Sequence, residues 1–232
     1  MHGSDRPKAR SRRLRRPTLT ACLALALVAG SGALAAQASA AMISVSQACY
    51  VNADTFKGAA VTVDGSGFTA GDSIELTGTD IFATATVGAD GTFVTTFSGP
   101  ILSTPNPAAS SFTITAIDES EGVTMATTTM EVANLAVATK PAEAKPSEKV
   151  MYTVSGFKSG AEIYAHYLHR NKVEATAKFG RATGPCGLLK AKAKFYPGTT
   201  HFDSYRVQFD DGRHYSSKSL PRLVTTLDIH IF

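Results

Sequence analysis

Short stretches of alternating apolar and polar residues recur along the chain, with turn-forming residues between them. Alternation places successive side chains on opposite faces of a β-strand, so each stretch predicts a strand with one buried face. Residues 171–178 are rich in Lys, Glu and Ala, which also suits a helix, but we predict a strand there. The clearest strand patterns are at residues 73–76, 92–97, 111–117, 205–209 and 223–231, and the turns are at 89–91, 104–107, 118–122 and 210–212. The pattern indicates an all-β protein.

One eight-residue pattern, Gly-Phe-x-x-Gly-x-x-Ile, occurs at residues 67–74 and again at 156–163, an offset of 89 residues. Glycine permits the positive φ angle of a tight connection, and Phe can close the end of an apolar core. We interpret the repeat as a duplication. Residues 138–148 contain two prolines with small and charged residues, as a short linker does. The sequence therefore predicts two tandem immunoglobulin-like β-sandwich domains, residues 41–137 and 138–232.

A family resemblance supports this division. Residues 61–74 resemble the start of a bacterial Ig-like repeat from secreted actinobacterial proteins, and the Asp-Gly hairpin within residues 87–93 fits the same repeat. Residues 180–187, with an embedded Gly-Pro-Cys-Gly, and residues 205–210 resemble a variant from exported actinobacterial proteins of uncharacterised function. The resemblance implies tandem Ig-like sandwiches at the cell surface. Its motifs are structural, so it implies no active site.

The N-terminal 40 residues differ in composition from the rest of the chain. Residues 1–17 hold seven Lys or Arg and one acid, residues 19–36 are uncharged and mostly apolar, and residues 36–40 are Ala-Gln-Ala-Ser-Ala. This order is typical of a secretory signal peptide. The apolar stretch is barely long enough to span a bilayer and contains Gly-Ser-Gly, which argues against a permanent anchor. We predict cleavage near Ala40, no membrane span afterwards, and a secreted or cell-surface location, by either the general or the twin-arginine route.

Removal of this segment changes the charge of the chain. The whole sequence has 23 Lys and Arg against 19 Asp and Glu, but the predicted mature chain has 16 against 18. The basic overall charge therefore gives no support to a nucleic-acid partner. Residues 41–139 carry one base and ten acids, whereas residues 140–232 carry fifteen bases and eight acids. Such a difference indicates either attraction between the two domains or a separate partner for each.

Alternating lysines mark the candidate binding surface. Lys190, Lys192 and Lys194 alternate with alanine, so on a strand their side chains share one face. Three further basic residues lie nearby in sequence, namely Lys178, Arg181 and Arg206. We predict that the six form a patch for an anionic cell-envelope polymer, another surface protein, or the acidic first domain.

Two cysteines remain after the predicted cleavage, Cys49 in the first domain and Cys186 in the second. Exported proteins meet oxidising conditions, so the pair suggests a disulfide across the domain boundary. Two separate thiols are the alternative. A bridge would close a loop of more than a hundred residues, which is worth up to about 5 kcal/mol in chain entropy.

No pattern of catalytic or metal-binding residues stands out. His166 and His169 are three apart, so on a strand they point to opposite faces and would not share a metal ion. We expect one ring to be half-buried and the other exposed. The Gly-x-Ser-x-Gly motif of many hydrolases is absent. We therefore predict no catalytic residue, metal or cofactor, and a non-enzymatic exported binding or spacer protein at the cell envelope. A small-molecule carrier that uses a sandwich cleft is the alternative, and a secreted hydrolase is less favoured.

Overall fold

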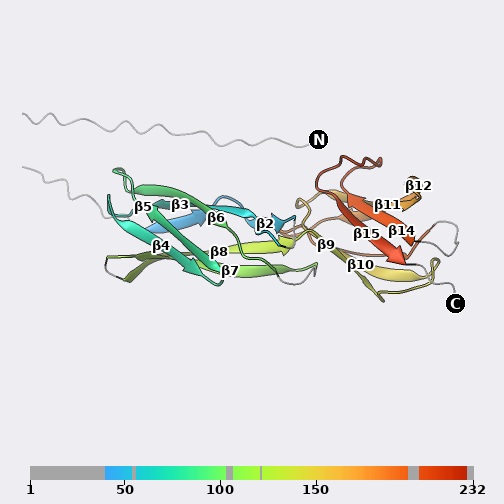
Figure 1. The fold of residues 1–232 in the computed structure, drawn as a ribbon, viewed down its shortest axis with the longest axis horizontal. Coiled ribbons are helices and arrows are strands. Elements are labelled where there is room, and N and C mark those ends of the chain that lie inside the picture. The colour runs from blue at the N-terminus through green and yellow to red at the C-terminus, as the bar shows by residue number, and fades with distance from the viewer. Residues whose placement is uncertain (1–39, 54–55, 103–106, 121, 198–203, 229–232) are drawn as a thin grey trace, which may run out of the picture. The chain divides into compact units, whose positions relative to one another are not determined.

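The computed structural model describes residues 40–53, 56–102, 107–120, 122–197 and 204–228 (Figure 1). In these residues the chain forms fifteen β-strands and no helix, which confirms the predicted all-β, Ig-like sandwich fold. The predicted signal peptide lies outside the described residues, apart from Ala40. Within the described part, no helix is long and apolar enough to cross a membrane.

The first eight strands form two facing sheets, here called the N-terminal sandwich. One sheet has the order β1-β3-β6 and the other has the order β2-β8-β7-β4-β5, in which β2 and β8 are parallel. The strands are β1 (Met42–Val45), β2 (Cys49–Asn52), β3 (Ala60–Ser66), β4 (Ser73–Gly78), β5 (Ile81–Thr86), β6 (Thr92–Ser98), β7 (Ala109–Asp118) and β8 (Val123–Asn134).

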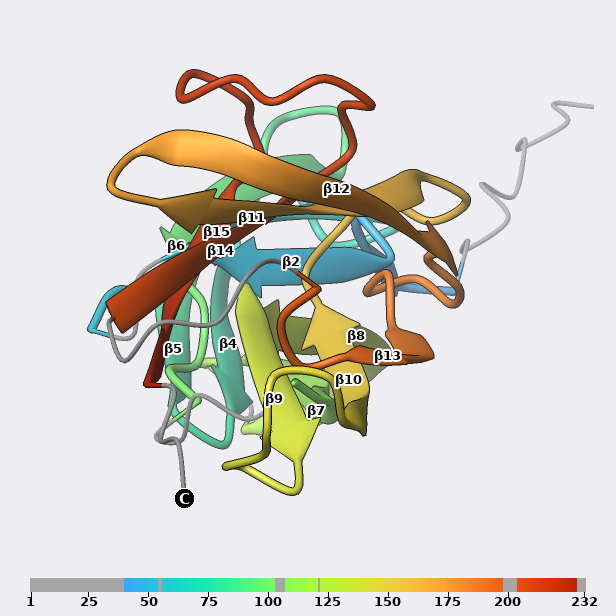
Figure 2. The same cartoon turned by 90° about the vertical axis from the view of Figure 1, so that its right-hand side faces the viewer.

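The remaining seven strands form the C-terminal sandwich, whose two layers are visible in Figure 2. Its smaller sheet has the order β13-β10-β9 and its larger sheet has the order β12-β11-β14-β15. The strands are β9 (Ala136–Lys140), β10 (Lys149–Ser155), β11 (Glu162–His169), β12 (Lys172–Arg181), β13 (Leu189–Lys194), β14 (Ser204–Asp210) and β15 (Leu223–Asp228). The division into domains at residues 137 and 138 stays a prediction; the sheets change between β8 and β9.

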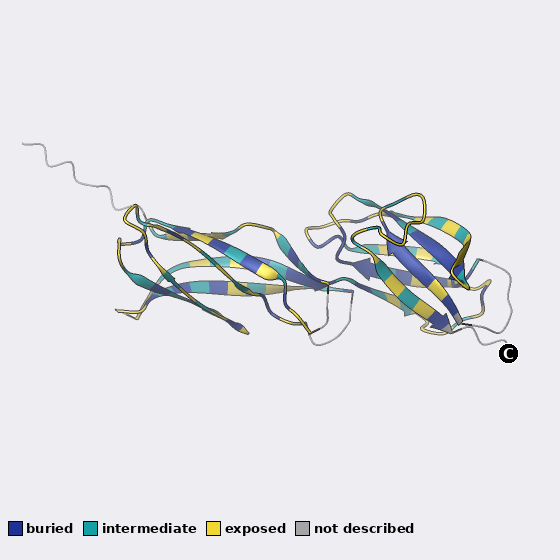
Figure 3. Cartoon of the chain, turned by 45° about the horizontal axis from the view of Figure 1, so that its top comes forward, coloured by how far each residue is buried: buried dark blue, intermediate teal, exposed yellow. Residues whose placement is uncertain are grey.

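Each sandwich has its own hydrophobic core because apolar residues alternate along its strands. Buried and exposed positions alternate in this way along most strands (Figure 3). Val61 and Val63 of β3 are fully buried in the N-terminal core, together with Ile74 and Leu76 of β4. The C-terminal core is built around aromatic rings, mainly Tyr152, Phe157, Tyr167, Phe195, Tyr196, Tyr205 and Phe209.

The repeated Gly-Phe segment has the same local conformation in both sandwiches. Gly67 and Gly156 have φ angles of 79° and 88°, in the left-handed region that glycine adopts without strain. The phenylalanine that follows each glycine is buried in the core of its own sandwich. The repeated sequence therefore forms a turn of the same conformation in each sandwich.

Candidate functional site

The alternating lysines of β13 lie on one exposed face of the smaller C-terminal sheet. Lys190, Lys192 and Lys194 are exposed, whereas the residues between them are half-buried against the core. Successive residues of a strand point to opposite faces, so the three ammonium groups share the outer face at intervals of about 6.7 Å. All three lysines therefore face solvent.

Strand pairing brings two more lysines to this face. Lys149 of β10 lies opposite Lys194, and Met151 of β10 lies between Lys192 on one side and Lys140 of β9 on the other. Neighbouring strands are about 4.8 Å apart, so the lysines are close neighbours across the sheet as well as along it. We call this surface the lysine face, and its members are Lys140, Lys149, Lys190, Lys192 and Lys194.

The lysine face carries positive charge that no acid on its own sheet offsets. Strands β9, β10 and β13 contain no Asp or Glu, and all five lysines are exposed. None of the five forms a salt bridge among those found in the described residues. Lys149 directly opposite Lys194 is a like-charge cross-strand pair, which destabilises a sheet by up to about 1 kcal/mol. The face is thus suited to an anionic partner.

The other three predicted basic residues lie on the larger sheet of the C-terminal sandwich. Lys178 Nζ is 2.7 Å from Glu162 Oε1, and Arg181 Nη2 is 3.1 Å from the same oxygen. The hydrogen bond from Lys178 is the main cause that lowers the pKa of Glu162 below its ordinary value. Arg206 donates a hydrogen bond to Asn171. The six predicted residues therefore do not form one patch, because Glu162 already partners two of them on a different sheet.

The two cysteines form a disulfide that connects the two sandwiches. Cys49 of β2 is bonded to Cys186, in the loop between β12 and β13, with their Cα atoms 5.3 Å apart. Two hydrogen bonds lie beside it: Ser155 Oγ donates to Asn134 O at 2.8 Å, and the Gly156 amide donates to Cys186 O at 2.9 Å. Ser155 and Cys186 are almost completely buried. The cross-link is therefore part of a packed junction.

The two histidines of β11 differ from our expectation. His166 is fully buried instead of half-buried, and His169 is largely covered, with 18% of its side chain exposed. Both rings have polar partners within the protein in place of water. Asp210 and Gly212 contact His166, and Glu174 contacts His169. The His169 ring packs at 4.8 Å from the ring of Tyr205, and its Nδ1 is 3.1 Å from Glu174 Oε1.

A buried hydrogen-bond network surrounds His166. Its Nε2 atom lies 3.2 Å from Asp210 Oδ1 and 3.0 Å from Gly212 O, both acceptors, so Nε2 carries the proton. Its Nδ1 forms a hydrogen bond with the hydroxyl of Thr176, 3.0 Å away. Gln208 is also buried, and its amide donates to Asp210 Oδ2 and to Ser216 O. The network attaches the loop after β14 to the outer face of the larger sheet.

Nothing in the network forms a metal site, since the described residues contain no cluster of three or more His, Cys, Asp or Glu placed to hold a metal ion. The sequence gives no signal that distinguishes this network from a solvated face. Gln208 and Asp210 are polar at alternate positions of a strand whose intervening residue, Phe209, is buried, and that pattern is also typical of a strand with one face in water.

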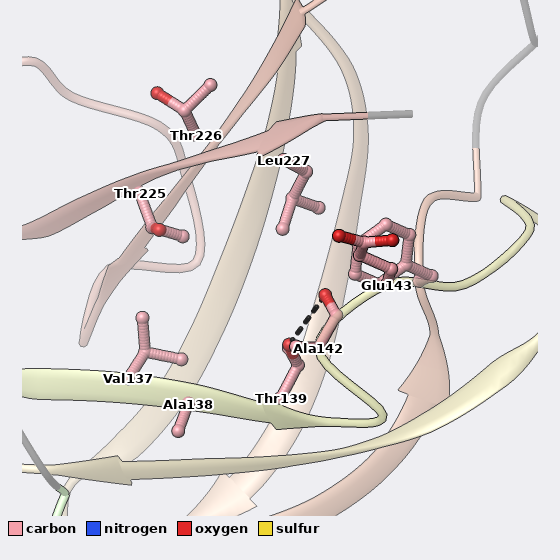
Figure 4. A pocket seen from close by; sticks show the side chains of 9 residues that line it. Val137, Ala138, Thr139, Ala142, Glu143, Thr225, Thr226 and Leu227 are labelled. Carbon is pink, nitrogen blue, oxygen red and sulfur yellow. Dashed lines mark hydrogen bonds between the residues drawn. The ribbon is translucent and has the colours of Figure 1, made fainter. Parts of the chain in front are cut away.

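The C-terminal sandwich has a cavity of about 430 Å³ between β9 and β15 (Figure 4). Each of these strands lies at the end of its sheet. Val137 and Thr139 of β9 point into the space from one side, and Thr225 and Leu227 of β15 point into it from the other. Phe195 also lines the cavity. This open edge was not foreseen from the sequence.

Comparisons with known proteins show similarity at the level of the fold alone. No family model matches the chain, and no curated protein matches it. Among solved structures, a Ca²⁺-stabilized adhesin that helps an Antarctic bacterium reach out and bind ice is 15% identical, with a TM-score of 0.34, over 83% of this chain and 48% of that one. This chain thus spans about half of that structure.

Two other structures have similar scores. A 1.5-MDa bacterial ice-binding adhesin is 16% identical with a TM-score of 0.31, over 82% of this chain and 65% of that one. The ligand-binding domain of human OSCAR is 10% identical with a TM-score of 0.31, over 82% of this chain and 97% of that one.

Proposed function

We propose that this chain is an exported, non-enzymatic protein of two Ig-like domains that binds an anionic cell-envelope polymer through the lysine face. The observation that carries the proposal is the set of five exposed lysines on three adjacent strands that contain no acid. The export step rests on the basic, apolar and Ala-x-Ala pattern of the N-terminal 40 residues.

The spacing of the lysines favours a linear polymer over a single small anion. Neighbouring lysines along β13 are about 6.7 Å apart, and neighbouring strands are about 4.8 Å apart. Both distances are shorter than the Debye length of about 8 Å at physiological ionic strength, so the charges attract a polyanion jointly. A chain of phosphodiester or carboxylate groups laid along β13 meets Lys190, Lys192 and Lys194 in turn.

An external partner is favoured over the acidic N-terminal sandwich because of where the lysines point. The side chains of β13 that face inward are Leu189, Ala191 and Ala193, and the lysines face solvent. The salt bridges found for the described residues all lie within the C-terminal sandwich. The charge of the lysine face, which takes part in none of these salt bridges, is therefore available to a ligand.

The test compares two triple variants that remove equal charge from different sheets. Lys190→Gln with Lys192→Gln and Lys194→Gln alters the lysine face. The matched control alters Lys178, Arg181 and Arg206 to Gln on the larger sheet. Binding to poly(glycerol phosphate), poly-L-glutamate and uncharged dextran is measured by surface plasmon resonance at 50, 150 and 500 mM NaCl.

We expect the lysine-face variant to bind both polyanions at least tenfold more weakly, the control variant to bind within about twofold of the wild type, and dextran not to bind. Affinity should fall steeply with salt, as exposed charges are screened. Equal losses in the two triple variants, or salt-independent binding, would show that the lysine face is not the binding site.

A further inference from the structure

The open edge between β9 and β15 distinguishes the C-terminal sandwich from the N-terminal one. In the N-terminal sandwich, β5 packs beside β6 and β1 beside β8, so the two sheets meet along both edges. In the C-terminal sandwich, β12 and β13 meet along one edge, where residues Thr183 and Leu188 also pair. Along the other edge, β9 and β15 come close only locally and leave the cavity of about 430 Å³.

Both strands at this opening have one free edge. Among the residues that the structure describes, β9 pairs only with β10, and β15 pairs only with β14. A free strand edge presents a row of backbone N–H and C=O groups, and these can pair with one more strand. The hydrogen bond drawn in Figure 4, from Thr139 Oγ1 of β9 to Ala142 O, joins the end of β9 to the turn that follows it.

We propose that the opening between β9 and β15 is an acceptor site for an extended peptide segment of a partner protein, one that alternates small apolar and acidic residues. The strand would add to the free edge of β9. Peptide backbone is the ligand chemistry that matches a free strand edge, and pockets for alternate side chains then give selectivity. β9 has five residues, so the segment would be about five residues long.

The inward positions of the segment are set by the lining of the cavity. Val137 and Thr139 face Thr225 and Leu227 across a space lined by both apolar side chains and threonine hydroxyls, and Phe195 also lines it. Alternate residues of an added strand would enter this space, and side chains of the size of Ala or Val suit its volume.

The outward positions of the segment are set by charge. A strand added to β9 extends the sheet that bears the lysine face, and its outward side chains become neighbours of Lys140. Lys192, Met151 and Lys140 already form one row across this sheet. An opposite charge beside a lysine stabilises a cross-strand pair, whereas another cation destabilises it. Glu143 also borders the opening, so the partner segment carries Asp or Glu only where its side chains lie beside Lys140.

The test uses three labelled five-residue peptides with blocked ends and the full chain with its disulfide intact. The sequence Val-Glu-Val-Glu-Val has the required alternation, Val-Val-Val-Glu-Glu has the same composition without it, and Val-Lys-Val-Lys-Val reverses the charge. Binding is followed by fluorescence anisotropy, and the site is mapped by amide chemical shifts.

Two neighbouring threonines of β15 provide a matched pair of variants. Both residues border the cavity, but the side chain of Thr225 points into it and that of Thr226 points away from it (Figure 4). Thr225→Phe should fill the space and weaken binding of the alternating acidic peptide at least tenfold, whereas Thr226→Phe should leave it within about twofold. Thr225→Leu is a smaller filling change, for use if the Phe variant folds poorly.

Charge variants test the second half of the proposal. Lys140→Glu should reverse the preference between the acidic and basic alternating peptides, and Lys158→Glu, in an exposed turn, should not. The glutamine triple variant of Lys190, Lys192 and Lys194 should keep most of the peptide affinity. This separates a failure of the strand site from a failure of polymer binding.

Shifts confined to β9 and β15, with the alternating acidic peptide preferred at least fivefold, are the expected result. Equal binding of the alternating and block peptides, equal effects of the two threonine variants, or no saturation by the acidic peptide would overturn the proposal. Binding of a small apolar dye that Thr225→Phe abolishes, without any peptide binding, would also overturn it and assign the cavity to a small-molecule ligand.

Discussion

Removal of the disulfide tests how the two sandwiches unfold. The perturbation is the double variant Cys49→Ser, Cys186→Ser. The bridge closes a loop with a sequence separation of 137 residues. If the whole chain unfolds in one step, the chain-entropy model assigns about 5 kcal/mol of the unfolding free energy to this constraint. The double variant would then lose that amount in a single transition.

Two separate transitions divide this free energy unequally. While the N-terminal sandwich is folded, the parallel pairing of β2 with β8 keeps Cys49 opposite Glu131, three residues before the end of β8 at Asn134. The loop that the bridge then closes runs from Asn134 to Cys186, about 50 residues, which corresponds to about 4 kcal/mol. When the N-terminal sandwich then unfolds as well, the closed loop becomes longer. The bridge therefore adds only about 1 kcal/mol to the unfolding free energy of this second step. We expect the C-terminal transition to lose about 4 kcal/mol in the variant if that sandwich unfolds first.

The assay can separate the two transitions because of where the tyrosines lie. The chain has no Trp, and six of its seven Tyr residues follow residue 140, with Tyr50 the exception. Tyrosine fluorescence during urea unfolding therefore reports mainly on the C-terminal sandwich, whereas far-UV circular dichroism reports on both. Wild-type protein in a phosphine reductant is the control and should match the double variant.

Three outcomes are distinguishable in this experiment. A large loss in one transition and a small loss in the other supports two separately folding domains. A single cooperative transition that loses about 5 kcal/mol contradicts the division at residues 137 and 138. No change in either transition, in the variant or under reduction, would refute the loop-closure reasoning itself.

Further predictions concern the C-terminal sandwich. Gly187→Ala should destabilise it by at least about 2 kcal/mol in urea unfolding, because φ is 58° and a Cβ would lie 1.8 Å from Phe157 O, whereas Gly184→Ala, with φ of 69° and open space, should cost about 1 kcal/mol. Asp210→Ala should cost about 3 kcal/mol in the same assay because it leaves buried donors unpaired, and the exposed neighbour Asp211→Ala should cost less than about 0.5 kcal/mol. Burial raises the pKa of Tyr167 from 10.0 to about 12. The unfolded chain therefore loses this proton at a lower pH than the folded chain does, so the unfolding free energy is unaffected below pH 10 and falls by about 1.4 kcal/mol per pH unit between pH 10 and 12. Burial also raises the pKa values of Tyr152 and Tyr196, so urea unfolding at pH 9 to 12, followed by circular dichroism, should show a fall of at least that slope, and a flat profile would contradict it.

Alternation of residues predicted several of the strands, and one predicted strand formed despite a helix-like composition. Residues 171–178 are rich in Lys, Glu and Ala, but the structure has β12 there. Ala175, Ala177 and Phe179 pack against the core, and Thr176 and Lys178 are exposed. The alternation of buried and exposed positions therefore determined the secondary structure here. Burial of one face of the strand contributes more to the stability of the fold than intrinsic helix propensity does.

The surfaces were less predictable, because they depend on pairing between distant segments. The shared face of Lys190, Lys192 and Lys194 follows from the period of one strand. The addition of Lys140 and Lys149 requires the register of β9, β10 and β13, which the sequence of one strand does not contain. For the same reason, Lys178 and Arg206 were grouped with β13 through nearness in sequence, although they belong to the opposite sheet.

The two sheets of the C-terminal sandwich differ in whether their basic residues have acidic partners. On the larger sheet, Lys178 and Arg181 both reach Glu162, so their charge is compensated locally. On the smaller sheet, Lys149 stands opposite Lys194 and no acid lies on the three strands. One Glu in place of Lys149 would relieve that repulsion, so this arrangement does not maximise stability. Departures from local consistency of this kind are expected where a surface serves binding, and the edge that remains open, beside β9, adjoins the same uncompensated face.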